Sequence, residues 1–158
     1  MWWFRATLLS LALAACGFTP VYGPGGGTAV LGAIRAQEPN SQIEFAFVEA
    51  IETRLGLPAS PRYDLLYNIS VEEEGRAITG SNDITRFTVD GVLTYRVRPV
   101  DDPEAEDVLT GRVQSFTSYS ASGSSIATFQ AKRDAEARLM QILADRLAER
   151  LVAAPELR

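Results

Sequence analysis

Two stretches of the chain alternate apolar and polar residues with a period of two. Over 86–98 the odd positions are apolar or glycine, and all the even positions but one are polar. The segment 63–73 places its tyrosine, leucine, isoleucine and valine side chains mainly on one face. A third segment, 108–119, is rich in threonine and serine. This period is typical of antiparallel strands with one face on a core and one in water, so the pattern predicts three half-buried strands.

Two other stretches repeat apolar residues every fourth position, which predicts helices over 41–55 and 126–152. Ser41 followed by Glu44 has the spacing of a capping box at a helix start, and Gly56 is placed to end that helix. The second helix carries one apolar face: Ala131, Ala135, Leu139, Leu143, Leu147 and Leu151. Asp134 and Arg138 are spaced to form an ion pair on its surface.

The order of these elements predicts the fold class. A short apolar run at 29–36 is interpreted as a first strand, Gly75–Asn82 as a turn, and Ser118–Ser125 as a loop. One-faced helices and a one-faced sheet can bury each other in two layers. We therefore expect an α+β two-layer sandwich: a mainly antiparallel sheet of about four strands with two helices packed on one face.

The first sixteen residues, MWWFRATLLSLALAAC, form a separate segment. The apolar run after Arg5 is too short to span a membrane, but it has the length of a signal-peptide core. Leu13-Ala14-Ala15-Cys16 resembles the lipobox of bacterial lipoproteins, in which the cysteine thiol takes a diacylglyceryl group. The alternatives are an ordinary signal peptide with an incidental cysteine, and a buried apolar cysteine. We expect Cys16 to be the lipidation site.

This interpretation divides the chain into three parts. Residues 1–15 are a cleaved lipoprotein signal peptide, 16–28 a lipidated flexible tether rich in glycine and proline, and 29–158 a single α+β domain. Gly17 follows the cysteine, and by resemblance to enteric sorting rules this favours the outer membrane, at its periplasmic face.

Composition excludes several classes of function. The chain has no histidine and one cysteine, so zinc sites with Cys/His ligands and Ser-His-Asp catalysis are impossible. A net charge of −5 and a single lysine argue against general nucleic-acid binding. Carboxylates remain, in the run 72–74 and in the segment 101–107, but both adjoin turn residues. We predict no catalytic residue, no metal site and no cofactor, and therefore no enzyme.

The lipobox, the segment Cys16-Gly17-Phe18-Thr19-Pro20-Val21-Tyr22-Gly23 and the alanine- and leucine-striped last helix together resemble the lipopolysaccharide-assembly lipoprotein family, LptE (RlpB), of the alphaproteobacterial type. Tyr119, ahead of the loop that leads to Ala131, Asp134 and Ala135, is a second point of similarity. The resemblance extends over nearly the whole mature chain, although each motif is short.

The resemblance implies a function and partners. Family members sit in the outer membrane, plug the LptD β-barrel, help it assemble and are reported to bind lipopolysaccharide. We therefore expect an LptD-like barrel, lipopolysaccharide and the outer membrane as partners, and no nucleic acid. The alternatives are an auxiliary lipoprotein of an ABC-type lipid-transport system and a lipid-anchored hydrolase that uses paired carboxylates.

Positive side chains are the candidate contacts for the anionic phosphates of lipopolysaccharide. Arg76 and Arg86 flank the turn between the first two long strands, and Lys132 and Arg133 form a second patch. The strand face that carries Arg86 also bears Arg96 and Arg98. The simpler alternative is that all of these are solvated surface residues.

Overall fold

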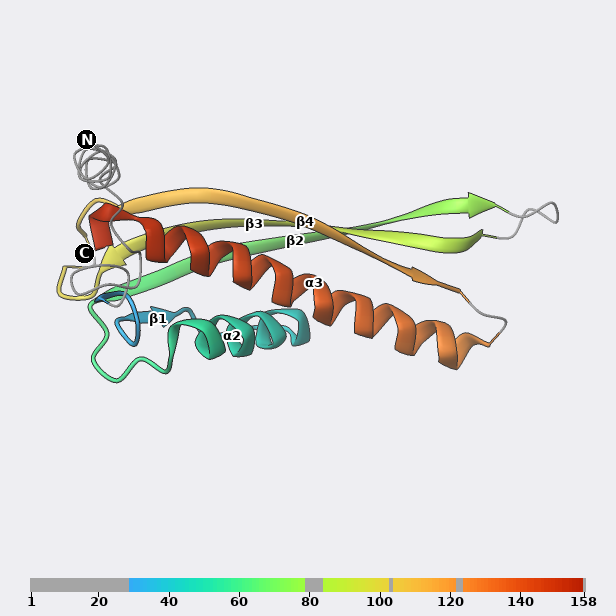
Figure 1. The fold of residues 1–158 in the computed structure, drawn as a ribbon, viewed down its shortest axis with the longest axis horizontal. Helices are drawn as coiled ribbons and strands as arrows, with labels where there is room; N and C mark the ends of the chain where they lie inside the picture. Colours follow the sequence, from blue (N-terminus) through green and yellow to red (C-terminus); the bar gives the residue numbers. More distant parts are fainter. Residues whose placement is uncertain (1–28, 79–83, 103, 122–123, 158) are drawn as a thin grey trace, which may run out of the picture.

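The computed structural model describes residues 29–78, 84–102, 104–121 and 124–157. In this part of the chain a four-stranded sheet is combined with two long helices (Figure 1). In chain order the elements are β1 (Ile34–Ala36), α2 (Gln42–Leu55), β2 (Tyr63–Ile78), β3 (Ile84–Pro99), β4 (Leu109–Ser120), α3 (Ser125–Ala153) and the short 3-10 helix η2 (Pro155–Leu157). The α+β class and the four strands agree with the sequence-based prediction.

The sheet is mixed, whereas a mainly antiparallel one was predicted. Its strand order is β1-β2-β3-β4, and β2 pairs antiparallel with β3, as does β3 with β4. β1 pairs parallel with β2, over Ile34 to Ala36 against Tyr63 to Leu65. The physical reason is the connection: α2 carries the chain back along the sheet before β2 begins, and a strand–helix–strand crossover produces parallel neighbours.

Two strand boundaries also differ from the prediction. The expected first strand at 29–36 is limited to Ile34–Ala36, because Gly32, with φ of 69°, belongs to a turn ahead of it. β2 continues to Ile78 through residues expected to form a turn. Pairing with β3, which sets Gly75 opposite Phe87, extends the strand, with a β-bulge between Gly75 and Ala77. Long-range pairing therefore outweighs the local turn propensity of this segment.

Both helices cover the same face of the sheet, as predicted. On this inner face α2 sets the ring of Phe47 4.9 Å from that of Tyr67 on β2. α3 lies so close to β3 that a Cβ atom on Gly91 would come within 2.8 Å of Leu139. The fully buried large side chains come from both layers: Phe47, Ile51, Leu65, Leu93, Leu139, Met140, Leu143, Leu147 and Leu151 among others.

The start of α2 confirms the predicted capping box. Ser41 Oγ accepts a 3.3 Å hydrogen bond from the backbone N–H of Glu44, and the Glu44 carboxylate accepts one of 2.7 Å from the Asn40 N–H. The Gly56 N–H donates to the Glu52 carbonyl at the other end. Local sequence therefore determines where this helix begins and ends.

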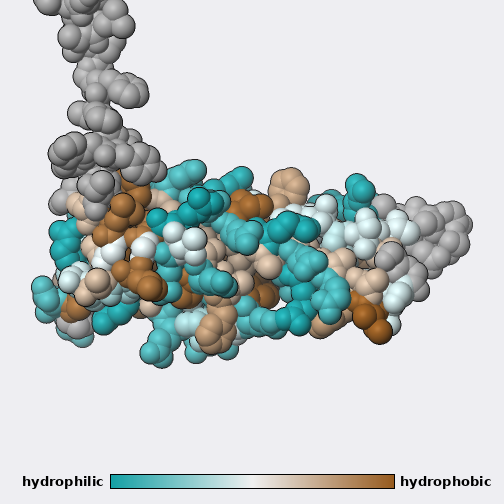
Figure 2. All heavy atoms as spheres, turned by 60° about the horizontal axis from the view of Figure 1, so that its bottom comes forward, coloured by the Kyte–Doolittle hydropathy of each residue, from teal (hydrophilic) through white to brown (hydrophobic). Residues whose placement is uncertain are grey.

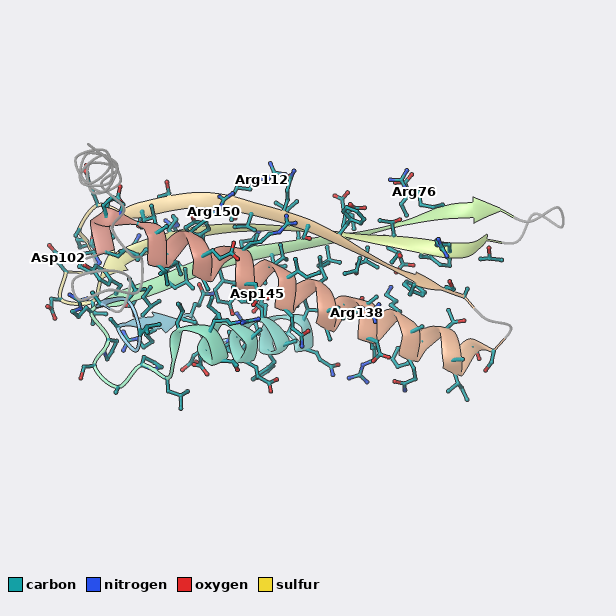
Figure 3. All side chains as sticks on the ribbon, in the orientation of Figure 1. Arg76, Asp102, Arg112, Arg138, Asp145 and Arg150 are labelled. Atoms are coloured by element: carbon teal, nitrogen blue, oxygen red, sulfur yellow. The ribbon has the colours of Figure 1, made fainter. Side chains whose placement is uncertain are left out.

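Three arginines of α3 reach the free edge of β4. They donate to three of its backbone carbonyls: Arg138 to Ser118 (3.3 Å), Arg146 to Gln114 (2.5 Å) and Arg150 to Arg112 (2.6 Å). We call these three residues the α3 arginine row. The predicted Asp134–Arg138 ion pair is not among the ion pairs of the described residues, because the Arg138 guanidinium is directed toward β4 (Figure 3).

The molecule is elongated along its strands and α3 (Figure 1). α2 is half the length of α3, with 14 residues against 29, so the N-terminal half of α3 projects beyond it. Figure 2 shows a mostly hydrophilic surface on the helical side, with separate hydrophobic spots, one of them toward the projecting end. Within the described residues, no helix combines the length and apolar character that a membrane span requires.

Candidate functional site

Cys16, with the rest of the signal peptide and tether, lies outside the described residues. Its lipidation therefore stays a prediction, as does the division of the chain at residues 15 and 28. The candidate site that can be described consists of the four cationic side chains of the folded domain.

These four side chains lie on two different sides of the molecule. Arg76 and Arg86 belong to the outer face of the sheet, which the helices do not cover, and Figure 3 shows Arg76 directed away from α3. Lys132 and Arg133 lie on the projecting half of α3. No single surface combines all four, and their role as lipopolysaccharide contacts stays a prediction.

On the outer face, Arg76 and Arg86 differ in their surroundings. The Arg76 guanidinium lies 2.9 Å from the Glu74 carboxylate, and both side chains are more than half exposed. An ion pair this exposed holds its partners only weakly. Arg86 is exposed, stands opposite Ser120 of β4, and has no ion-pair partner among the described residues. Arg86 is therefore the more available cation of the two.

Lys132 is held by an acidic partner. Its Nζ lies 2.5 Å from Glu73 Oε2, and the Tyr119 hydroxyl donates to Glu73 Oε1 at 3.0 Å. The hydrogen bond to Glu73 is the main reason that the pKa of Lys132 is raised above its ordinary value. Burial, followed by the hydrogen bond to Glu73, raises the pKa of Tyr119 to about 12. Glu73 thus largely neutralises the charge of Lys132 within the domain. This makes Lys132 a weaker candidate for binding an external anion.

Arg133 lies beside an open groove between the projecting half of α3 and the start of α2. Its guanidinium carbon lies 5.8 Å from the centroid of the Phe129 ring, and Phe129 is 55% exposed. The groove encloses about 630 Å³ and has apolar walls from Ile43, Ala46, Phe129 and Ala137, and its charged lining residues are Arg133, Asp134 and Glu136. The apolar wall can contact an apolar chain, and Arg133 can meet an anionic group beside it, although two carboxylates line the same groove.

The outer face carries further arginines toward its other end. Arg98 lies 3.1 Å and Arg96 3.9 Å from Asp107, so both share one carboxylate. Arg112 of β4 extends from the same face, since its strand neighbour is Thr94 (Figure 3). The sequence pattern indicated Arg96 and Arg98 but not Arg112. The alternation of β4, once set in register with β3, is the signal that would have found it.

The carboxylate runs show no grouping that resembles a metal centre. Among the described residues no three Asp, Glu, His or Cys side chains are placed to hold a metal ion. Glu74 pairs with Arg76, Glu73 with Lys132, and Asp107 with the arginines of β3. The observed role of these acids is to neutralise nearby cations.

Comparison with known proteins gives one family and a set of similar folds. A family model described as "LptE: Lipopolysaccharide-assembly" matches residues 32–151, which is most of the described chain. A search among curated proteins found no match.

Several solved structures share the fold. A candidate lipoprotein from Caulobacter crescentus CB15 superposes with a TM-score of 0.65 at 20% identity, over 82% of this chain and 96% of that one. Rare lipoprotein B from Shewanella oneidensis gives 0.54 at 10% identity, over 75% and 91%. A minor lipoprotein from Acinetobacter baumannii gives 0.55 at 10% identity, over 77% and 89%. At these identities the similarity establishes the fold alone.

Proposed function

The chain belongs to the LptE lipopolysaccharide-assembly family, and on that premise we propose that it is an outer-membrane lipoprotein that plugs and helps assemble the LptD β-barrel of the lipopolysaccharide translocon. In this proposal Cys16 carries the lipid anchor, and the folded domain lies on the periplasmic side of the membrane. The family match over residues 32–151 is the observation that carries the proposal.

The shape and polarity of the domain support a role as a plug. The outer face of the sheet is not covered by either helix, and most of its side chains along β3 and β4 are polar or charged; the exceptions among the described side chains are Val92 and Phe116, and Phe116 is 67% exposed. A mostly polar, elongated face of this kind suits the polar interior of a large barrel. Within the described residues no side-chain nitrogen or oxygen is buried without a hydrogen-bond partner.

Lipopolysaccharide contact is proposed for Arg86 and Arg133, with Arg76 as an auxiliary group. Arg86 is exposed and unpaired among the described residues, and Arg133 adjoins the apolar groove at Phe129. Phosphates would bind the guanidinium groups, and an acyl chain fits the apolar wall next to Arg133. The ion pair with Glu73 places Lys132 last among the four candidates.

Co-purification tests the barrel partner. The tagged full chain, extracted with mild detergent, should retain a β-barrel protein of large mass, and depletion of the chain should lower lipopolysaccharide at the cell surface. Recovery with a periplasmic complex and an inner-membrane transporter, without a barrel, would instead favour an auxiliary lipoprotein of an ABC-type lipid-transport system.

Charge reversal tests the lipopolysaccharide contacts. We expect Arg86→Glu and Arg133→Glu each to weaken binding of lipopolysaccharide to the purified chain, and the double variant to weaken it further. Arg112→Glu is the matched control, because it makes the same charge change on the outer face toward the other end of β4. Equal losses in all three variants would indicate a general charge effect and contradict the assignment of residues.

A further inference from the structure

Among the described residues, the edge of β2 that faces away from β3 is unpaired over much of its length. β1 pairs with β2 only from Tyr63 to Leu65, and the Gln37 N–H then donates to the Leu65 carbonyl at 2.9 Å. Beyond that point no strand of the described chain pairs with β2 on this side, and Figure 1 shows β3 as its one neighbour toward the bulge at Gly75.

Strand alternation identifies which backbone groups this edge presents. The backbone N–H of Tyr63 and the carbonyl of Leu65 face β1. Because alternate residues of a strand direct their N–H and C=O groups to the same side, Ile69, Val71 and Glu73 present theirs to the open edge. The exposure of Ser70 and of 72–76 agrees with a free edge. Six backbone hydrogen-bonding groups, one N–H and one C=O on each of three residues, are thus available to an added strand.

The opposite edge of the sheet is partly protected. The α3 arginine row donates to three carbonyls of β4, so three of the acceptors that another strand would need are already occupied. Proteins commonly block exposed strand edges in such ways to prevent unwanted pairing. The described chain shows no comparable row of side chains along Ile69 to Glu73 on β2, so the β4 edge is partly protected and the β2 edge is left accessible.

The side chains beside the open edge define what strand would fit it. On the outer face Glu72 stands directly opposite Asp90, so two carboxylates adjoin there, and Glu74 follows, in an exposed ion pair with Arg76. Like charges opposite each other are unfavourable, and a cation on the far side of Glu72 would offset them. On the inner face Ile69 and Val71 are half-buried against the core. An added strand would therefore place basic side chains on the outer face and aliphatic ones on the inner face.

We propose that the β2 edge from Ile69 to Gly75 is a strand-addition site for an extended segment of another protein that alternates aliphatic and basic residues. A second copy of the chain fits poorly, because self-pairing would bring two runs of three glutamates, 72–74, together. Backbone hydrogen bonds would supply affinity, and the glutamates would supply selectivity. The inference does not depend on lipopolysaccharide contact or on the barrel partner.

A defined peptide tests this site on the full chain. The probe is an end-blocked eight-residue peptide of alternating valine and lysine, and the control peptide carries glutamate in place of lysine. The lysine peptide should bind more tightly and slow amide hydrogen exchange at Ile69, Val71 and Glu73, but not at Gln114 on β4. Equal binding of both peptides, or protection elsewhere in the chain, would overturn the proposal.

Two variant pairs locate the contact. Glu72→Lys with Glu74→Lys should weaken binding of the lysine peptide about tenfold, since two favourable cross-strand charge pairs are lost. Glu104→Lys with Glu106→Lys makes the same net charge change in the exposed β3–β4 turn and should leave binding unchanged. Val71→Pro removes an N–H from the edge of β2, whereas Gln114→Pro removes one from the edge of β4. Only the first should abolish binding, and equal effects within either pair would refute the site.

Discussion

The hydroxyl of Tyr119 donates a 3.0 Å hydrogen bond to the carboxylate of Glu73, although their strands, β4 and β2, are separated by β3. The ring of Tyr119 stacks on Phe87 of the intervening strand, with centroids 5.2 Å apart and planes 12° from parallel. Glu73 also binds Lys132 of α3. One carboxylate therefore connects three elements under the projecting half of α3, where α2 does not reach.

This contact predicts a pH-dependent stability. The pKa of Tyr119 is about 12 in the folded chain and about 10 when unfolded, so between these values the unfolded chain releases a proton that the folded chain keeps. Tyr119 thus makes its full contribution to the free energy of unfolding below pH 10. That contribution declines as the pH rises toward 12. Tyr119→Phe should lower stability at pH 8 by about 1–2 kcal/mol and flatten that decline.

Denaturant titrations at pH 8, 10 and 11 measure both effects. The pKa of Tyr67 is raised in the same way, mainly by burial, and Tyr67 is present in both proteins, so their difference isolates Tyr119. Parallel pH profiles for the wild type and the variant would contradict the role of this hydrogen bond.

A second prediction concerns Gly111, which faces Tyr95 across the β3–β4 ladder. A Cβ atom at Gly111 would lie 2.5 Å from the Tyr95 Oη and 2.7 Å from its Cζ. The ring is buried and stiff, so Gly111→Ala should destabilise the domain by about 1–3 kcal/mol. Calorimetry checks the loss. In a Tyr95→Leu background the same substitution should cost less, and an undiminished cost would show that the clash is not its cause.

The α3 arginine row provides a third prediction. Replacement of Arg138, Arg146 and Arg150 by methionine keeps the apolar stems but frees three β4 carbonyls. We expect concentration-dependent self-association through β4, detected by sedimentation, and a stability loss of at most about 1 kcal/mol for each exposed hydrogen bond. The control replaces Arg35, Arg54 and Arg62, which contact no β4 carbonyl, by methionine. Self-association in the control alone, or in neither protein, would contradict edge protection.

A fourth prediction tests the anchor. Cys16→Ala removes the thiol that takes the lipid, so the exported protein should lack the diacylglyceryl mass and should leave the membrane fraction. Ala15→Ser keeps a small residue before the cysteine and should preserve both properties. Mass spectrometry of the mature N-terminus and fractionation measure the outcome. An unmodified Cys16 in the wild-type protein would remove the basis for membrane anchoring.

Features of the fold that depend on residues close in sequence were mostly predicted correctly, whereas several features that depend on residues far apart in sequence were not. Ser41 and Glu44 located the start of α2 because capping is local. The alternation over 86–98 identified the two faces of β3, because side-chain direction in a strand follows sequence parity. The predicted end of β2, at residue 73, was wrong, because pairing with β3 extends the strand to Ile78 through residues with turn propensity. The four cationic candidates stay a prediction, and their distribution over two faces of the fold was not evident from the sequence.

The sequence by itself determined the family resemblance, the α+β class, the two helices with their apolar faces and the inward set of strand residues, because these depend on periodicity and local motifs. The tertiary structure alone decided that the sheet is mixed, that Glu73 binds Lys132 and Tyr119, and that Arg138, Arg146 and Arg150 occupy three carbonyls of β4 while the edge of β2 stays open among the described residues. The physical reason is that each of these contacts joins elements distant in sequence, and their register and packing are fixed only when the helices close over the sheet.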